Sequence, residues 1–137
     1  MARTFAQVVG VIFLLVGILG FFPGLLSAYS GPDLVVDSGR GLLLGLFPVN
    51  LLHNLVHLAV GLWGLASART ASGAIGFARG LAIFYGLLTI MGLIPGLNTT
   101  FGLIPIHGND VWLHALTALI SAYVGWGVPA TRDSTVR

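Results

Sequence analysis

The sequence predicts an all-α integral membrane protein, a four-helix bundle made of two repeated helical hairpins. Composition is the first indication, because 56% of the 137 residues are hydrophobic and only 7% are charged. Soluble domains carry about 25% charged residues, since their surface faces water. The second indication is a set of four long apolar runs, and the third is an internal repeat. The length fits a single domain covering residues 1–137.

Each apolar run is long enough to cross a lipid bilayer as a helix. The runs hold roughly 18 to 21 residues, or about 27–31 Å of helix, and the hydrocarbon core of a bilayer is about 30 Å thick. Apart from histidine, the only acid or base within them is Arg79. We therefore expect four spans, at residues 5–22, 48–66, 74–94 and 111–128.

A repeated motif stands at the start of the second and fourth runs. GLFPVNLLHNLVH at residues 45–57 aligns without a gap with GLIPIHGNDVWLH at residues 102–114. The alignment pairs Pro48 with Pro105, Asn50 with His107, His53 with Asp110 and His57 with His114. All four histidines of the chain thus fall on paired polar positions.

A second repeated motif ends the first and third runs, as GFFPGL at residues 20–25 and GLIPGL at residues 92–97. It favours a retained first span over a cleaved signal peptide. Together the two motifs predict hairpins that run in the same direction, related by a pseudo-twofold axis along the membrane normal.

The arginines predict the orientation of the chain. Five of the six lie on one side of the predicted spans, at Arg3, Arg69, Arg79, Arg132 and Arg137. The positive-inside rule then places both termini in the cytoplasm. The segment 27–45 becomes an extracytoplasmic loop, and its Gly, Pro, Ser and Asp content predicts irregular structure.

Polar residues form a stripe on the second run and another on the fourth. Residues spaced by three, four or seven positions share one helix face, and this spacing relates Asn50, His53, Asn54 and His57. It also relates His107, Asp110 and His114, provided that a helix begins soon after Pro105. Small residues continue both faces, so we expect the second and fourth spans to pack on each other.

Three interpretations of these stripes remain open. In the first, the polar groups form a structural network that fixes the hairpins in register and includes Asn50, Asn54 and Asn109. The second is a transition-metal or haem site, with His53, His57, His107, Asp110 and His114 as metal ligands, or His57 and His114 as axial ligands of a haem. The third is a path for protons or small solutes.

Other functions find less support in the sequence. Without cysteine, the chain has no disulfide, thiolate metal site or covalent haem attachment. No basic patch suits nucleic acid. Thr99 and Ser121 have no base positioned by sequence, so we assign no catalytic residue and do not expect an enzyme. The expected partners are the lipid bilayer and either other membrane subunits or further copies of this chain.

Residues 47–66 (FPVNLLHNLVHLAVGLWGLA) and 105–119 (PIHGNDVWLHALTAL) resemble an uncharacterised family of small bacterial four-helix membrane proteins, domain of unknown function 4383. The resemblance implies a bacterial inner-membrane protein with four spans, and it implies no substrate or cofactor. The leading hypothesis is a structural or accessory subunit. The alternative is a metal- or haem-binding membrane protein with a redox or transfer role.

Overall fold

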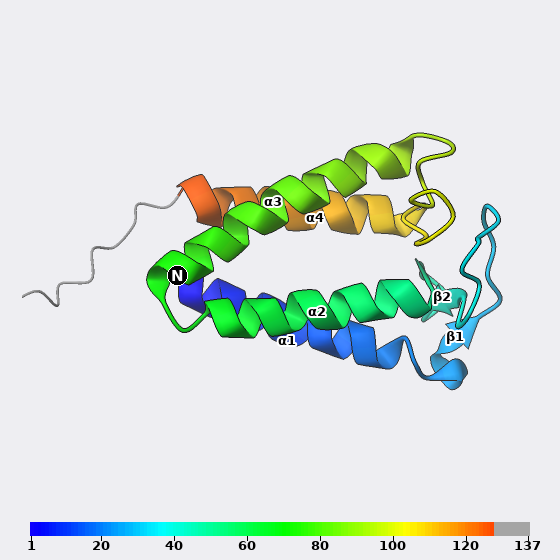
Figure 1. Ribbon diagram of the computed structural model, residues 1–137, viewed down its shortest axis with the longest axis horizontal. Coiled ribbons are helices and arrows are strands. Elements are labelled where there is room, and N and C mark those ends of the chain that lie inside the picture. The colour runs from blue at the N-terminus through cyan, green and yellow to red at the C-terminus, as the bar shows by residue number, and fades with distance from the viewer. Residues whose placement is uncertain (128–137) are drawn as a thin grey trace, which may run out of the picture.

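The computed structural model describes residues 1–127, which are mostly helical (Figure 1). Two helices, α1 and α3, are long and apolar enough to cross a membrane. The four α-helices are α1 (Ala2–Leu19), α2 (Leu51–Ser67), α3 (Ala71–Leu93) and α4 (Asn109–Ala122), and a π-helical turn, η2 (Tyr123–Gly127), extends α4. Position 128, the predicted end of the fourth span, lies outside the described residues.

The helices pack in sequential pairs, α1 against α2 and α3 against α4 (Figure 1). Glycines bring α1 and α2 close together. A Cβ atom at Gly61 would lie 2.6 Å from Leu14 Cγ and 2.8 Å from the carbonyl oxygen of Gly10. The backbones therefore approach more closely than larger side chains would permit.

The predicted packing of the second span on the fourth through small residues is wrong. The small face of α2 is already occupied by α1, since Gly64 faces the backbone of Ala6 and Gly10. In the other half, Gly125 faces Arg79 of α3. Small residues favour whichever helix can approach them, and here it is the helix of the same sequential pair.

Both repeated prolines precede their helices instead of lying in the first turn. Pro48 lies in a strand, and α2 begins after Asn50, whose side-chain oxygen accepts a hydrogen bond from the backbone N–H of His53 at 2.9 Å. Helix α4 begins only after Gly108, which has a φ of 64°. His107 is therefore outside the helix, and the predicted helical face joining it to Asp110 and His114 is wrong.

A small antiparallel sheet replaces part of the expected irregular loop, so the fold is not strictly all-α. It follows a single 3-10 turn, η1 (Pro23–Leu25), and its strands lie in the order β1 (Leu26–Ser27), β2 (Gly41–Leu43) and β3 (Phe47–Val49). The β2–β3 hairpin turns through Leu44 and Gly45, with φ values of 54° and 73°. Pro48 lies on the edge strand, where its missing N–H is tolerated.

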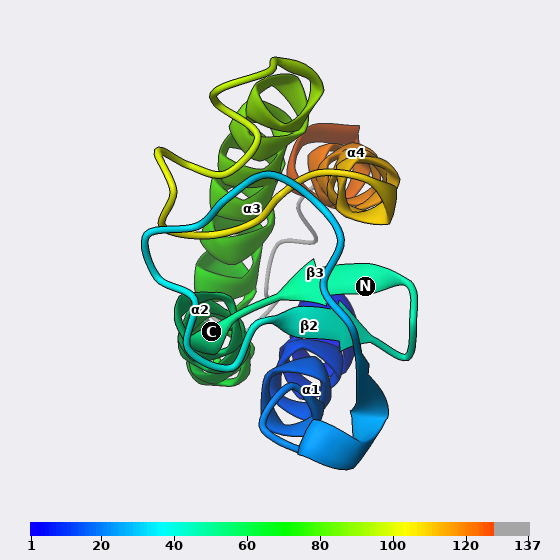
Figure 2. The same ribbon diagram turned by 90° about the vertical axis from the view of Figure 1, so that its right-hand side faces the viewer.

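The two ends of the bundle differ in character. The N-terminus, the α2–α3 turn and η2 gather at one end, and the sheet and residues 94–108 gather at the other (Figure 1). Figure 2 looks onto the sheet end, where the two long connections meet and Val35 N–H donates to the Gly102 carbonyl at 2.8 Å. At the opposite end, Arg3 Nε donates to the Ala68 carbonyl at 2.9 Å.

Aromatic side chains join the two helix pairs along α1 and α3. The rings of Phe5 and Phe77 have centroids 6.4 Å apart, and those of Phe13 and Tyr85 meet edge to face at 5.5 Å. Phe77, Leu81 and Tyr85 are fully buried in this core. The α1–α3 contact is thus the apolar part of the interface between the two helix pairs.

Gly61→Ala should destabilise the protein, because the added methyl group meets the backbone of α1. Overpacking of this kind costs about 1–3 kcal/mol. Gly76→Ala is the matched control, since a Cβ there has no atom within 4 Å in another part of the structure. It should stabilise helix α3 by roughly 0.5–1 kcal/mol. Unfolding monitored by circular dichroism in detergent measures both, and equal effects of the two variants would contradict the close contact.

Candidate metal centre

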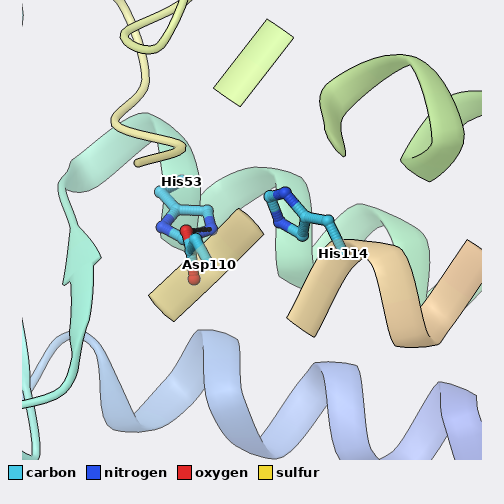
Figure 3. A group of neighbouring side chains, drawn as sticks. All are labelled: His53, Asp110 and His114. Atoms are coloured by element: carbon cyan, nitrogen blue, oxygen red, sulfur yellow. Dashed lines mark ion pairs between the residues drawn. The ribbon is translucent and has the colours of Figure 1, made fainter. Parts of the chain in front are cut away.

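Three potential metal ligands from separate parts of the sequence meet inside the bundle (Figure 3). His53 comes from the first turn of α2, and Asp110 and His114 come from the beginning of α4. One ligand atom of each lies within 4.8 Å of the others, and the three residues are between 1% and 4% exposed. The folded chain thus gathers two imidazoles and one carboxylate at a buried point.

The tautomer of His53 follows from its hydrogen bond. Its Nδ1 lies 3.0 Å from the Pro48 carbonyl oxygen, which can only accept, so Nδ1 carries a proton. In the neutral ring, Nε2 then has a free lone pair, and it faces Asp110 Oδ2 at 3.6 Å. Histidines that bind metals are typically oriented in this way by a carbonyl on their other nitrogen.

Polar atoms of this group lack hydrogen-bond partners among the described residues. They are His53 Nε2, Asp110 Oδ2 and His114 Nδ1. Buried polar atoms are nearly always paired, because leaving one unpaired costs about 1–3 kcal/mol. Two acceptors that face each other at 3.6 Å also need a cation or a proton between them to be stable.

The spacing of the group is close to that of a tetrahedral metal site. With bonds of about 2.0–2.1 Å, the ligand atoms of zinc lie about 3.3 Å apart. The His53–Asp110 distance of 3.6 Å is near this value, and the outer limit of 4.8 Å requires a side-chain shift on the order of 1 Å. Three protein ligands would leave one coordination position open.

Backbone and amide contacts hold the two sides of the centre in place. The Asn50 side chain caps α2 and donates to the carbonyls of Val36 at 2.8 Å and Leu103 at 2.7 Å. The Asn109 side chain donates from the second half of the chain to the first, to the Leu46 carbonyl at 3.2 Å. The third asparagine of the predicted network, Asn54, instead packs against Gly20 of the segment after α1.

His57 lies beside the centre, although it is not one of the three gathered ligands. Its Nδ1 donates to the His53 carbonyl at 3.1 Å, and Phe13 stacks on its ring at 5.0 Å. The Tyr85 ring lies 5.0 Å from His114 and 5.5 Å from Phe13. A haem held between His57 and His114 would have to displace these aromatic rings. The sequence did not predict that Phe13 and Tyr85 contact the two histidines.

His107 is separate from the centre. It lies before α4, and its Nε2 is 3.0 Å from the Tyr29 hydroxyl. That hydroxyl donates to the Pro32 carbonyl at 2.9 Å, so it accepts from His107 Nε2–H. Burial lowers the pKa of His107 and raises the pKa of Tyr29, with Arg40 opposing the shift of Tyr29. The pairing joins two loops at the sheet end.

The family model described as "Domain of unknown function (DUF4383)" matches residues 3–127. The chain belongs to this family. A search of curated proteins and a search of solved structures each found no match. Membership in this family thus agrees with the resemblance seen in the sequence and leaves the function to be argued from the site.

Lowering the pH should weaken the folded protein partly through His107. Because its pKa is below 6.5 when folded, the unfolded chain binds more protons, and the free energy of unfolding falls as the pH drops from about 6.5. His107→Gln should make this decline shallower. Tyr29→Phe removes the same contact but keeps the titrating ring, so its decline should persist. Equal slopes for His107→Gln and the wild type, measured by thermal unfolding between pH 7.5 and 4.5, would contradict this assignment.

Proposed function

We propose that this protein is a membrane-spanning metal-binding protein, with one divalent transition-metal ion held by His53, Asp110 and His114. The observation that carries the proposal is the buried meeting of three ligand atoms without hydrogen-bond partners. Two imidazoles and one carboxylate suit zinc and ferrous iron better than calcium or magnesium, which prefer oxygen ligands.

The outward faces of the helices support a place in the membrane. Within α1 to α4 the only charged residues are Arg3, Arg79 and Asp110. Exposed large apolar residues occur on every helix, including Val8, Val11, Leu15 and Ile18 on α1, Leu55 and Leu62 on α2, Ile83, Leu87 and Ile90 on α3, and Leu116 and Leu119 on α4. Water disfavours so much contiguous apolar surface, whereas lipid solvates it.

Contacts between corresponding residues support an origin by duplication. His53 and Asp110, paired in the sequence repeat, contact each other in the folded chain. The two copies of the second motif are 72 positions apart. In this register Phe13 corresponds to Tyr85, and the rings of these two residues are also in contact. A residue that contacts its own counterpart lies next to the axis relating the two copies. The metal centre then belongs to both hairpins and to neither alone.

The carbonyls that accept hydrogen bonds from two arginines follow the register of the first motif at the other end of the bundle, although Arg3 and Arg79 themselves do not correspond in the register of the second motif. Arg3 of α1 donates to the Ala68 carbonyl, and Arg79 of α3 donates to the Gly125 carbonyl at 2.8 Å. Ala68 and Gly125 are 57 positions apart, as are His57 and His114. An arginine near the last carbonyls of a helix is favourable, and the side chain can extend toward the membrane surface.

The structural hypothesis accounts for less of this geometry. A network that only fixed the register of the hairpins would gain most by pairing each buried donor with an acceptor. The Asn50 and Asn109 side chains do this, since both donate across the two halves. The atoms of His53, Asp110 and His114 do not. The asparagines thus supply register, and the three ligands supply a binding site.

Purified protein in detergent should bind Zn²⁺ with one ion per chain. Asp110→Asn keeps the shape of the side chain and removes its charge, and His53→Gln removes a nitrogen ligand. Loss of a second-shell group costs 10–100-fold in metal affinity, so loss of a ligand should cost at least about 100-fold. Titration against a competing chelator measures the affinity, and Co²⁺ absorption reports the geometry.

His107→Gln is the matched control for that titration, since it alters a histidine outside the centre. It should bind Zn²⁺ like the wild type, and Zn²⁺ should raise the melting temperature of both. Absence of stoichiometric binding to the wild type, or equal loss in all three variants, would exclude the proposed centre. The cluster would then be structural.

The topology can be tested with two single cysteines in this cysteine-free chain. Ser72 and Ser38 are exposed, the first beside the α2–α3 turn and the second near the sheet. With both termini in the cytoplasm, Ser38→Cys should react with an impermeant maleimide on intact cells from the outside. Ser72→Cys should react only after the cells are opened. Reaction of both variants on intact cells would contradict the four-span arrangement.

A further inference from the structure

A cavity on the side of the bundle differs in composition from the metal centre. It lies between α1 and α4 and has a volume of about 210 Å³. Its walls are mostly apolar, and exposed Ile12, Leu116 and Ile120 stand at its rim. His57 and His114 bound its deep side.

The corresponding crevice between α2 and α3 holds a smaller cavity, of about 160 Å³, bounded by His53 and His57. Farther along the same crevice, Trp63 packs edge to face on Phe77 at 4.8 Å and covers Gly80. In the 57-residue register of the repeat, Ile120 of α4 stands where α2 has Trp63. The smaller side chain leaves the α1–α4 cavity open at the level where an indole ring occupies the other crevice, and Ser121 lines the cavity there. This extension of the cavity is therefore a specific difference between the two halves.

Ser121 gives this cavity a polar anchor. It is fully buried and lines the cavity, and its Oγ has no hydrogen-bond partner among the described residues. Hydroxyl groups inside helices usually donate to the carbonyl four residues earlier. Thr117 does so to Leu113 at 2.8 Å, and Thr89 does so to Tyr85 at 2.7 Å. The Ser121 hydroxyl thus remains available to a molecule in the cavity.

From these features we infer that the cavity binds a neutral, lipid-soluble molecule whose carbonyl oxygen accepts a hydrogen bond from Ser121. A carboxylate or phosphate would need a cation, and among residues 1–127 no arginine or lysine lines the cavity. The anchor is at the buried side and the apolar rim faces outward, so such a molecule would enter from the lipid with its polar group first. This site rests on the proposed membrane location for its route of access, but it uses none of the metal-ligand atoms as its anchor.

The probe for this site is 2-undecanone with a ¹³C-labelled carbonyl, added to the protein in lipid nanodiscs. Binding should saturate at one molecule per chain, and the bound carbonyl resonance should shift as expected for an accepted hydrogen bond. Undecane and undecanoate should bind about five- to tenfold more weakly, since each lacks a neutral acceptor. Ser121→Ala should reduce the affinity for the ketone to that for undecane.

Ile120→Trp tests the cavity independently of the anchor, because it supplies the ring that occupies the corresponding position in the other half. It should abolish binding of both the ketone and the alkane. Leu119→Trp adds the same ring to an exposed neighbour outside the cavity and should leave binding unchanged.

Binding that does not saturate, that survives Ile120→Trp, or that does not distinguish ketone from alkane would overturn the inference. Zn²⁺ binding should persist in Ile120→Trp, so failure of this site and failure of the metal centre are distinguishable.

Discussion

The contact between His53 and Asp110 is the constraint on which the arrangement of the polar end depends. These are two acceptors, buried and facing each other at 3.6 Å, in a chain with almost no other charge inside its helices. Several surrounding features serve to keep them there. The Pro48 carbonyl fixes the His53 ring, and Asp110 lies in the first turn of α4, where the helix dipole favours a carboxylate. Asn50 ties the two halves together beside them. A bound cation would complete this arrangement by supplying the charge that both acceptors need.

Much of the fold could be predicted because apolar periodicity and length are local properties of the chain. The four helices occur close to the predicted runs, and His53 and Asp110, which the repeated motif aligns, are neighbours in the folded chain. Which helix packs against which could not be predicted from these local properties. Small residues on α2 indicate a close neighbour but not its identity, and the sequential hairpin partner α1 occupies that face.

Which of the predicted ligands lie together in the metal centre depends on the backbone conformation, and the spacing of polar residues in the sequence does not reveal that conformation. His107 has the right spacing to share a face with Asp110 and His114, but spacing matters only inside a helix. Because Gly108 has a positive φ, α4 begins only after it, and His107 lies outside the helix, where it contacts Tyr29. The short strands escaped prediction for a related reason, since two or three residues are too few to show an alternating pattern. Glycine after His107 was the one available signal, because glycine commonly occupies such backbone conformations.

Under the proposed duplication, divergence between the two halves explains how one bundle can hold distinct sites. At the position of His53 the second copy has Asp110, and this difference turns two like imidazoles into a mixed ligand pair. At the position of Trp63 the second copy has Ile120, and this difference leaves the α1–α4 cavity open at the level where Trp63 occupies the other crevice. His114 borders both places. A molecule in the cavity and an ion in the centre would thus share one imidazole, so occupancy of either site would alter the orientation or electron density available to the other. Such coupling is reciprocal by thermodynamic necessity. It gives the unlike pair of halves a property that a symmetric bundle, with an indole ring in each crevice and two histidines facing each other, would lack.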